Sequence, residues 1–422
     1  MKKQPSDRKR LKEFYTAALP AAGKIPPVCR HFRVCGGCQF QNVPYPDQLK
    51  IKRDALLFIG ETVARECQER PEDRELADKL REAMAGVEPK INPSQRTYAY
   101  RQRMDYVFAF ESAGLRRAGW HRDVLELEEC PLLGELGFRL FDLARRQVRE
   151  AGIPCYNYLT FQGDLRYFVI RRTRKDDFLL SLVTRSKENG PAVMGVLENL
   201  FKTGKIRSGH WLLNDSRSDS SFGSSLFRVG DECLAEQFLD DVWLPIGPNS
   251  FCQANPEVAE RAYSEITSFL ARPGELVFDL YSGVAAIAQV LARQGARVVA
   301  LENLPENVRL AHLGLEWNHL AEQVELVESD AASWLAGPFL TENRERPKGL
   351  VVNPPRPGVE RSGLEAILKL HPERLAYLSC NPFTLFRDLT SLITRYRLVS
   401  LSLFDMFPQT QHFETLALLE RL

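Results

Sequence analysis

Cys380 occupies a position where a thiol could act as a nucleophile. It follows the apolar run LAYLS and precedes Asn381 and Pro382, which suit the cap and the first position of a helix. A thiol at a strand end, beside a helix N-terminus, lies near the positive end of the helix dipole, which favours the thiolate. The alternative is a small buried side chain without a chemical role.

The last segment of the chain offers a carboxylate that could act as a general base. Residues 398–422 predict two strands joined by a turn at 408–411, which places His412 and Glu414 at the start of the last strand. Apolar Phe413 nearby would raise the pKa of the Glu414 carboxyl and suit it to accept a proton. A solvated glutamate on an edge strand is the alternative.

Three cysteines in CRHFRVCGGC have the C-x5-C-x2-C spacing of a metal or cluster site. They are Cys29, Cys35 and Cys38, and Cys130 offers a distant fourth thiolate. The set fits either a [4Fe–4S] cluster or a zinc ion with four cysteine ligands. The cysteines without such context, expected to be packing residues, are Cys67, Cys155 and Cys233.

A regular alternation of strands and helices is expected from about residue 253 onward. Strands are expected at 275–283, 296–302 and 323–330, with helices at 285–295 and 306–320 between them. This βαβαβ order predicts an open parallel sheet, in which ligands bind beyond the carboxyl ends of the strands. The strand ends of interest are therefore 279–283, Glu302, Asp330 and Asn353.

Two of these strand ends fit a nucleotide-type cofactor site. Gly283 lets backbone N–H groups approach a ligand at a helix N-terminus, and Glu302, 23 residues after Asp279, could hold a ribose diol. The loop DLYSGVAAI lacks the second glycine of a full fingerprint, so a plain strand-to-helix turn is the alternative. The amide of Asn353, before two prolines, could bond a cofactor or a base edge, or belong only to a rigid loop.

The rest of the chain is expected to form three further parts. They are a flexible basic tail at 1–28, a cysteine segment and helix at 29–87, and a mixed α+β domain at 88–250 that supplies Cys130. Helices are expected at 47–70 and 136–152, and strands at 100–110, 165–172 and 176–184. The α/β domain would then occupy residues 251–422.

Positive charge gathers in three local patches, although the net charge is only +1. One is the tail, with Lys2, Lys3, Arg8, Lys9, Arg10 and Lys12; the others are RTYAYRQRMDY at 96–106 and RYFVIRRTRK at 166–175. In the last two patches, cations alternate with apolar residues at the period of a strand, so we expect the cationic side chains to lie on one face of that strand. Such a face suits a nucleic-acid backbone. For the tail, a solvated, disordered N-terminal segment is an equal alternative.

The composition is that of an ordinary globular protein without a membrane span. With 422 residues, 44% hydrophobic and 26% charged, the chain can form two or three domains with their own cores. No segment approaches the roughly 20 apolar residues that span a bilayer, and the N-terminus lacks the apolar core of a secretory signal. Nine cysteines without such a signal indicate a reducing compartment, so we expect a cytoplasmic protein.

Five motifs, in order along the chain, resemble the RNA uracil-5-methyltransferase family. They are FCQAN at 251–255, DLYSG at 279–283, NPPR at 353–356, SCNP at 379–382 and DMFPQTQHFET at 405–415. The resemblance implies an α/β fold in which 251–422 form a Rossmann-like class I methyltransferase domain with a seven-stranded sheet. It implies that S-adenosylmethionine is bound by Gln253, Tyr281, Glu302 and Asn353, to which the strand ends add Gly283 and Asp330.

The resemblance also implies a mechanism. In this family a cysteine thiolate adds to C6 of uracil, and the resulting enolate attacks the sulfonium methyl group of the cofactor. A base then removes the C5 proton so that the thiolate can leave. By motif position the nucleophile is Cys380 and the base is Glu414. The target uridine must be unpaired, or flipped out of a stack, to be reached.

For the cysteine cluster, the resemblance favours iron over zinc. Iron–sulfur members of the family carry the spacing of Cys29, Cys35 and Cys38. We therefore expect these three thiolates, with Cys130 as the fourth ligand, to hold a [4Fe–4S] cluster.

Two departures from the family pattern bear on cofactor and substrate. Ala285 stands where members usually have the second glycine of the cofactor loop, which puts cofactor affinity in question. Asn353 rather than aspartate precedes the two prolines, and no β-rich domain of the TRAM type precedes Cys29. These features resemble the branch that acts on 23S ribosomal RNA. We expect a monomer with RNA as its partner, and neither DNA nor a membrane.

Three other functions remain open at this point. A tRNA uridine C5-methyltransferase would use the same chemistry on another RNA. An enzyme that methylates exocyclic amines would have an aromatic residue where this chain has Arg356, which counts against it. A non-catalytic RNA-binding iron–sulfur protein with a degenerate cofactor loop would bind RNA but not S-adenosylmethionine.

Overall fold

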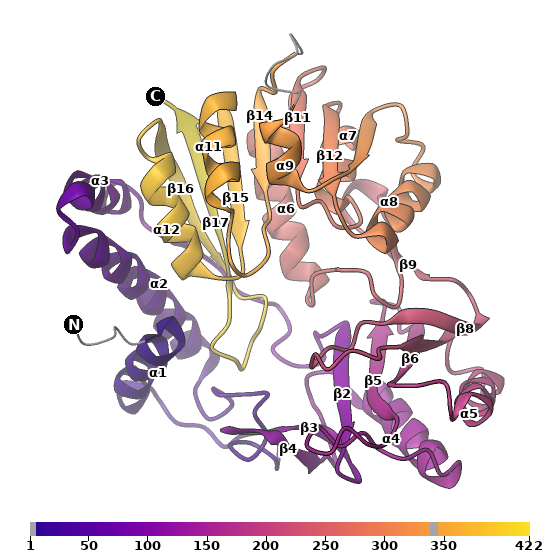
Figure 1. Cartoon of the computed structure of the whole chain (residues 1–422). Coiled ribbons are helices and arrows are strands. Elements are labelled where there is room, and N and C mark those ends of the chain that lie inside the picture. Colours follow the sequence, from indigo (N-terminus) through magenta and orange to yellow (C-terminus); the bar gives the residue numbers. More distant parts are fainter. Residues whose placement is uncertain (1–5, 338–344) are drawn as a thin grey trace.

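Two β-sheets, each covered by helices, make up most of the molecule. The computed structural model describes residues 6–337 and 345–422. Figure 1 shows the C-terminal sheet at the top, the central domain below it, and the N-terminal helices along the left side. The carboxyl ends of the parallel strands point down, towards the central domain, so a site at those ends lies between the two domains.

The C-terminal sheet has eight strands in the order β1-β16-β17-β15-β14-β11-β12-β13. They are β1 (Lys90–Asn92), β11 (Leu276–Leu280), β12 (Arg297–Glu302), β13 (Val324–Glu328), β14 (Gly349–Val352), β15 (Arg374–Ser379), β16 (Tyr396–Phe404) and β17 (Glu414–Arg421). All neighbours run parallel except β17, which is antiparallel to both β15 and β16. The expected βαβαβ order and parallel sheet are confirmed.

Seven of these strands, β11 to β17, lie within residues 251–422 as expected, and β1 adds an eighth from outside that range. β1, which was expected in the mixed domain, pairs in parallel with the last residues of β16 from Ser402 to Phe404. It covers part of an edge whose backbone groups would otherwise lack a partner strand. Residues 90–92 therefore belong to the C-terminal sheet.

Helices cover both faces of this sheet because side chains along each strand alternate between two cores. One core is built with α6 (Pro256–Leu270), α7 (Ala286–Arg293) and α8 (Pro305–Trp317). The other is built with α9 (Ala331–Ala336), α11 (Arg361–Leu370) and α12 (Pro382–Leu392), together with two N-terminal helices. Of the helices that the structure describes, none combines the length and apolar character that a membrane span requires.

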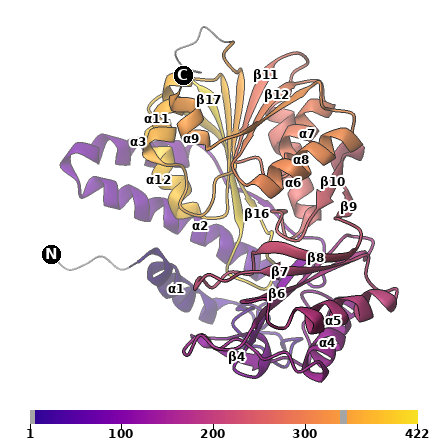
Figure 2. The ribbon, with the colours of Figure 1, turned by 45° about the vertical axis from the view of Figure 1, so that its right-hand side comes forward.

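The central domain is a seven-stranded sheet in the order β4-β3-β2-β5-β6-β7-β8. Its strands are β2 (Arg103–Ala109), β3 (Ser112–Arg117), β4 (Trp120–Glu126), β5 (Leu165–Arg172), β6 (Phe178–Thr184), β7 (Ser208–Leu213) and β8 (Ser224–Gly230). Helices α4 (Glu135–Glu150) and α5 (Gly190–Lys202) pack on one face. The hairpin of β9 (Leu234–Gln237) and β10 (Trp243–Ile246) leads from this domain to α6 (Figure 2).

The N-terminal segment is helical where a flexible tail was expected. It forms α1 (Asp7–Ala18), followed by α2 (Tyr45–Gln68) and α3 (Arg74–Ala85). Short 3-10 helices follow α1 and α2, namely η1 (Leu19–Ala21) and η2 (Pro71–Asp73), and a further one, η3 (Leu239–Asp241), lies before β10. Leu11, Phe14 and Tyr15 of α1 pack on the core that α2 and α12 share, and this packing stabilises a helix that would be marginal alone. Lys2 and Lys3 lie outside the described residues.

A buried ion pair joins α2 to the loop between β16 and β17. Lys52 Nζ lies 2.5 Å from Asp405 Oδ1, and both side chains are fully buried. Nζ also donates to the carbonyls of Phe407 and His412, each at 3.0 Å. Asp405 Oδ2 accepts from the Tyr45 hydroxyl at 2.8 Å. The loop that precedes β17 is therefore fixed from the N-terminal side.

The arginines of RYFVIRRTRK lie inside the central domain, so the prediction of an exposed cationic face is wrong for this segment. Exposed fractions of Arg166, Arg171 and Arg172 are 0%, 2% and 7%. All eight residues of β5 are buried, so side chains on both faces of this strand are covered. Arg166 donates to backbone carbonyls of the loop 214–218, and Arg171 donates to the loop 247–250. Both arginines hold loops rather than a ligand.

Candidate active site

The predicted nucleophile and the predicted base come together at the ends of two neighbouring strands. β15 and β17 pair antiparallel as far as Ser379 and Thr415, and the next pair in this register is Cys380 and Glu414. Residues opposite each other in an antiparallel pair have side chains on the same face, with Cβ atoms about 5 Å apart. The thiol and the carboxyl therefore face one another across the strand ends.

The Cys380 thiol is half-buried, and its pKa is raised to about 11. Burial is the main cause and the charge of Glu414 adds to it, whereas Arg356 and a backbone N–H group lower the pKa. Asn381 caps α12 as expected, since its side chain accepts from the Phe383 N–H at 3.2 Å. The expected thiolate-favouring effect of this helix end is outweighed by burial, so the free protein holds a thiol.

Glu414 is buried, with 3% of its surface exposed, and burial raises its pKa to about 8. The raised pKa was expected. Its strand, β17, lies between β15 and β16, so the alternative of a solvated carboxylate on an edge strand does not hold. Arg356 acts in the opposite direction and lowers the pKa.

Arg356 lies beside the predicted nucleophile and base, although the sequence analysis assigned it no role in the site. It lies within hydrogen-bond reach of the Cys380 sulfur and lowers the pKa of both Cys380 and Glu414. Its backbone carbonyl accepts from Asn381 Nδ2 at 3.0 Å, which ties the NPPR loop to the cap of α12. Because β14 and β15 are parallel neighbours, the two motifs NPPR and SCNP end at the same edge.

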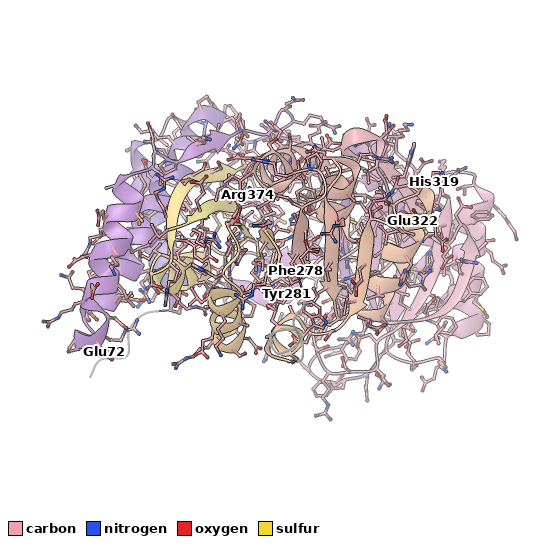
Figure 3. The ribbon with its side chains drawn as sticks, turned by 90° about the horizontal axis from the view of Figure 1, so that it is seen from above. Glu72, Phe278, Tyr281, His319, Glu322 and Arg374 are labelled. Atoms are coloured by element: carbon pink, nitrogen blue, oxygen red, sulfur yellow. The ribbon has the colours of Figure 1, made fainter. Side chains whose placement is uncertain are left out.

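A cavity at the carboxyl end of β11 collects four of the six predicted cofactor residues. They are Gln253, Tyr281, Gly283 and Asn353. Figure 3, seen from above, labels Tyr281 and Phe278 near the middle of the molecule. Phe278 lies within β11, and Tyr281 directly follows this strand. Gln102 and Glu236 of the central domain also line the cavity. Sequence reasoning missed these two because only the packing of the domains brings them to the site.

The other two predicted cofactor residues lie beside the cavity rather than in its lining. Glu302 Oε2 accepts from the Gly283 N–H at 2.8 Å, and so holds the glycine loop in place. Asp330 caps α9 by accepting from the Ser333 N–H at 2.8 Å. Burial, and then the charge of Asp330, raise the pKa of Tyr281 to about 12.

The cofactor loop has three residues with positive φ. Tyr281, Gly283 and Ala285 have φ of 63°, 59° and 57°. Ala285, in place of the second glycine, is fully buried in the core formed with α6 and α7, and it is not part of the cavity lining. Its side chain therefore takes no cofactor space. Its left-handed backbone costs about 1 kcal/mol, and burial of its methyl group offsets about 0.8 kcal/mol of this cost.

The four predicted cluster ligands line one cavity. They are Cys29, Cys35, Cys38 and Cys130. Burial raises the pKa of each thiol, and the other cysteines add to the shift of the first three. Within residues 6–337 and 345–422, no group of three or more histidine, cysteine or acidic side chains has a geometry that holds a metal ion. The three cysteines expected to be packing residues, Cys67, Cys155 and Cys233, contact the hydrophobic cores.

Ala285→Gly is expected to change neither stability nor cofactor affinity appreciably. Relief of backbone strain and loss of a buried methyl group nearly cancel, so the free energy of unfolding should change by less than about 1 kcal/mol. Titration calorimetry should give a Kd for S-adenosylmethionine within about threefold of the wild type. The matched variant Gly283→Ala, whose Cβ would enter the cavity, should weaken binding by roughly tenfold or more. A much tighter Kd for Ala285→Gly would show that the missing glycine limits affinity.

Glu414→Gln should remove a pH dependence of stability. The folded-state pKa of about 8 lies above the ordinary value of 4.5, so the folded state gains stability from the protonated carboxyl. This contribution is fully present below pH 4.5 and is lost as pH rises through about 8. Between about pH 6 and about pH 9, urea titrations should show the wild type losing roughly 2 kcal/mol relative to the variant.

A control for this effect is Glu198→Gln, on the exposed side of α5. Its carboxylate is solvated, so its removal should leave the pH dependence as in the wild type. Parallel curves for the wild type and Glu414→Gln would contradict the burial of a titrating carboxyl at position 414.

Comparison with known proteins agrees with this geometry. A profile of the family described as tRNA (Uracil-5-)-methyltransferase matches residues 245–422. An uncharacterized RNA methyltransferase of Caldanaerobacter subterraneus is 31% identical over 412 residues, which are 94% of this chain and 85% of that protein. A tRNA (uracil(54)-C(5))-methyltransferase of Pyrococcus horikoshii is 29% identical over 391 residues, 92% of this chain and 84% of that protein.

A solved structure extends the likeness to the fold of nearly the whole chain. The Pyrococcus abyssi tRNA (uracil-54, C5)-methyltransferase in complex with S-adenosyl-L-homocysteine aligns with a TM-score of 0.72 and 26% identity. The alignment covers 92% of this chain and 86% of that one. Sequence motifs, fold and relatives agree: the chain belongs to the RNA (uracil-5-)-methyltransferase family and is an RNA methyltransferase.

Proposed function

We propose that this protein transfers a methyl group from S-adenosylmethionine to C5 of a uridine in RNA. The observation that carries the proposal is the facing pair of Cys380 and Glu414 at the ends of β15 and β17. A thiol and a buried carboxyl so placed supply the nucleophile and the base that C5 methylation of uracil needs. Arg356 beside them supplies a positive charge.

The reaction begins with attack of the Cys380 sulfur on C6 of uracil. Arg356 lowers the pKa of this thiol and would stabilise the thiolate as it forms. Formation of the S–C6 bond moves electrons onto the C4 carbonyl oxygen, and the resulting enolate is nucleophilic at C5. Carbon C5 takes the methyl group from the sulfonium sulfur, which leaves as S-adenosylhomocysteine.

The second half of the reaction removes the C5 proton. Glu414, in its ionised form, accepts this proton, the C5–C6 double bond forms again, and Cys380 leaves as thiolate. Burial makes Glu414 a stronger base than an ordinary carboxylate, because its pKa is raised to about 8. The product is 5-methyluridine, and the proton on Glu414 then passes to solvent.

The cavity at the end of β11 fits S-adenosylmethionine by the chemistry of its lining. Asp279 Oδ1 is buried there and has no hydrogen-bond partner among the described residues, so it can accept a bond from a ligand. The amides of Gln253 and Asn353 can bond polar groups, and the Tyr281 ring can stack on an adenine. Glu302 would hold the ribose hydroxyls, and Gly283 lets the backbone approach the ligand.

As the target we propose 23S ribosomal RNA. The support is the sequence of the NPPR loop, with Asn353 before the prolines, and its resemblance to the branch that acts on this RNA. The alternative is a uridine of tRNA, which is the substrate in the names of the two Pyrococcus relatives. The chemistry at Cys380 would be the same for both.

We also propose a [4Fe–4S] cluster as a resident group, held by Cys29, Cys35, Cys38 and Cys130. The support is the shared cavity that these four thiols line, together with the C-x5-C-x2-C spacing of Cys29, Cys35 and Cys38. When bound, the cluster would join the N-terminal segment to the central domain. Zinc with the same four ligands is the alternative.

Cys380→Ala is expected to abolish methyl transfer while RNA binding survives, because the variant cannot form the S–C6 bond. Glu414→Gln should instead trap a covalent protein–RNA adduct, seen as a retarded band on a denaturing gel, because the C5 proton stays in place. The matched control Cys233→Ala should keep wild-type turnover. Unchanged turnover of Cys380→Ala would rule out the mechanism.

The target follows from the same assay. Purified protein is incubated with labelled S-adenosylmethionine and total RNA from a strain that lacks it, and the methylated nucleotide is mapped. A 5-methyluridine in 23S ribosomal RNA supports the proposal; one in tRNA selects the alternative.

The cluster can be tested by absorbance and metal content. An anaerobic preparation should be brown and absorb near roughly 400 nm, with about four irons per chain. Cys38→Ser should lose this absorbance, and the control Cys67→Ser should keep it. A colourless protein with one bound zinc would contradict the iron–sulfur assignment.

A further inference from the structure

A cationic groove lies between α1, the cysteine segment and the hairpin of β3 and β4. It has a volume of about 960 Å³. Arg8 and Lys12 line it from α1, Arg33 from the cysteine segment, and Arg116 and Arg117 from the hairpin. Three separate parts of the chain therefore place cations around one groove.

Helix α1 presents its cations outward because its other side is buried. Leu11, Phe14 and Tyr15 pack on the core, whereas Arg8 and Lys12 are exposed. The two cations are four residues apart, so they lie one above the other on one helix face, about 6 Å apart along the axis. This separation is similar to that of consecutive phosphates in an extended single strand.

The charges on the α1 side of the groove are not neutralised by the protein. Among the residues that the structure describes, the side chains of Arg8, Lys12 and Arg33 make no ion pair. On the other side, Arg116 and Arg117 pair with Asp219 and Asp123 at 2.7 and 2.5 Å. Exposed cations without a carboxylate partner are suited to bind phosphate groups of a nucleic acid.

The groove reaches the loop that precedes the proposed base. Gln411 lines it, three residues before Glu414. The side chain of the neighbouring His412 is exposed. Desolvation, and then the cations of Arg356, Lys52, Arg101 and Arg8, lower its pKa. Arg8 of α1 therefore contributes to the same positive field as Arg356, which lies beside Cys380.

We propose that this groove binds the single-stranded RNA segment next to the target uridine, with Arg8 and Lys12 of α1 contacting its phosphates. This inference rests on the proposed function and extends it to the path of the substrate. A single strand is favoured because the target uridine must be unstacked to reach Cys380. Two aromatic rings are available for stacking of unpaired bases: Phe32 in the groove and Trp120, 72% exposed, at the tip of the hairpin.

The test compares Arg8→Glu/Lys12→Glu with Lys202→Glu/Lys205→Glu, a control pair at the end of α5 that changes the net charge equally. The probe is a fluorescein-labelled oligouridylate, and its Kd is measured over a range of salt concentrations. The α1 variant should bind about tenfold or more weakly, and its slope of log K against log salt should fall by about 1.4, or 0.7 for each lost phosphate contact. The control should bind as the wild type does.

Methyl transfer to total RNA from a strain lacking the protein gives a second readout. For the α1 variant, KM for RNA should rise by about tenfold while kcat stays within about twofold, since Arg8 and Lys12 touch no reacting atom. The neutral pair Arg8→Gln/Lys12→Gln should show a smaller change in the same direction, which guards against a folding defect in the glutamate pair. Wild-type Kd and KM in both α1 variants would overturn the groove assignment.

Other outcomes separate this inference from the proposed function. An equal loss of binding in the control pair would attribute the effect to net charge and overturn the inference. If the wild type methylates no uridine yet binds the oligouridylate through Arg8 and Lys12, the proposed function fails and the groove stands. If methylation proceeds and the α1 variants bind normally, the groove fails and the proposed function stands.

Discussion

The buried pair of Lys52 and Asp405 is the constraint on which the geometry of the candidate site depends. Removing two charges from water costs several kcal/mol for each ion, and the cost is offset only when their hydrogen bonds are satisfied. Here the ammonium donates to Asp405 and to two loop carbonyls, and Asp405 also accepts from Tyr45. Few loop conformations satisfy all of these partners at once. These contacts therefore fix the conformation of the loop and, with it, the position of Glu414 at the start of β17.

At the strand ends, burial and one arginine act against each other. Burial raises the pKa of both Cys380 and Glu414, and Arg356 lowers both. Burial thus favours the neutral forms of the proposed nucleophile and the proposed base in the free protein. A cation close to both groups lowers the free-energy cost of ionising either one during a reaction.

Sequence reasoning located the elements whose pattern is local. Cys380 and Glu414 could be placed because one directly follows a strand and the other begins a strand, both with clear periodicity. The antiparallel pairing of β15 and β17 brings the two residues together. Helix α1 was missed because a short polar helix depends on tertiary packing that no local pattern reveals. The alternation around Arg166 and Arg171 was real, yet it could not show that both faces of β5 are covered. Strand β1 is too short for a periodic signal.

The position of β1 has a consequence for how the chain folds. The chain contributes β1 to the C-terminal sheet, leaves to build the whole central domain, and returns for the other strands of that sheet. The central domain is therefore an insertion within the catalytic domain, and contacts such as Lys52 with Asp405 join residues 353 positions apart. Contacts of such sequence separation form late, because loop closure must come first. Strand β1 can therefore pair with β16 only after the chain between them, including the whole central domain, has been synthesised.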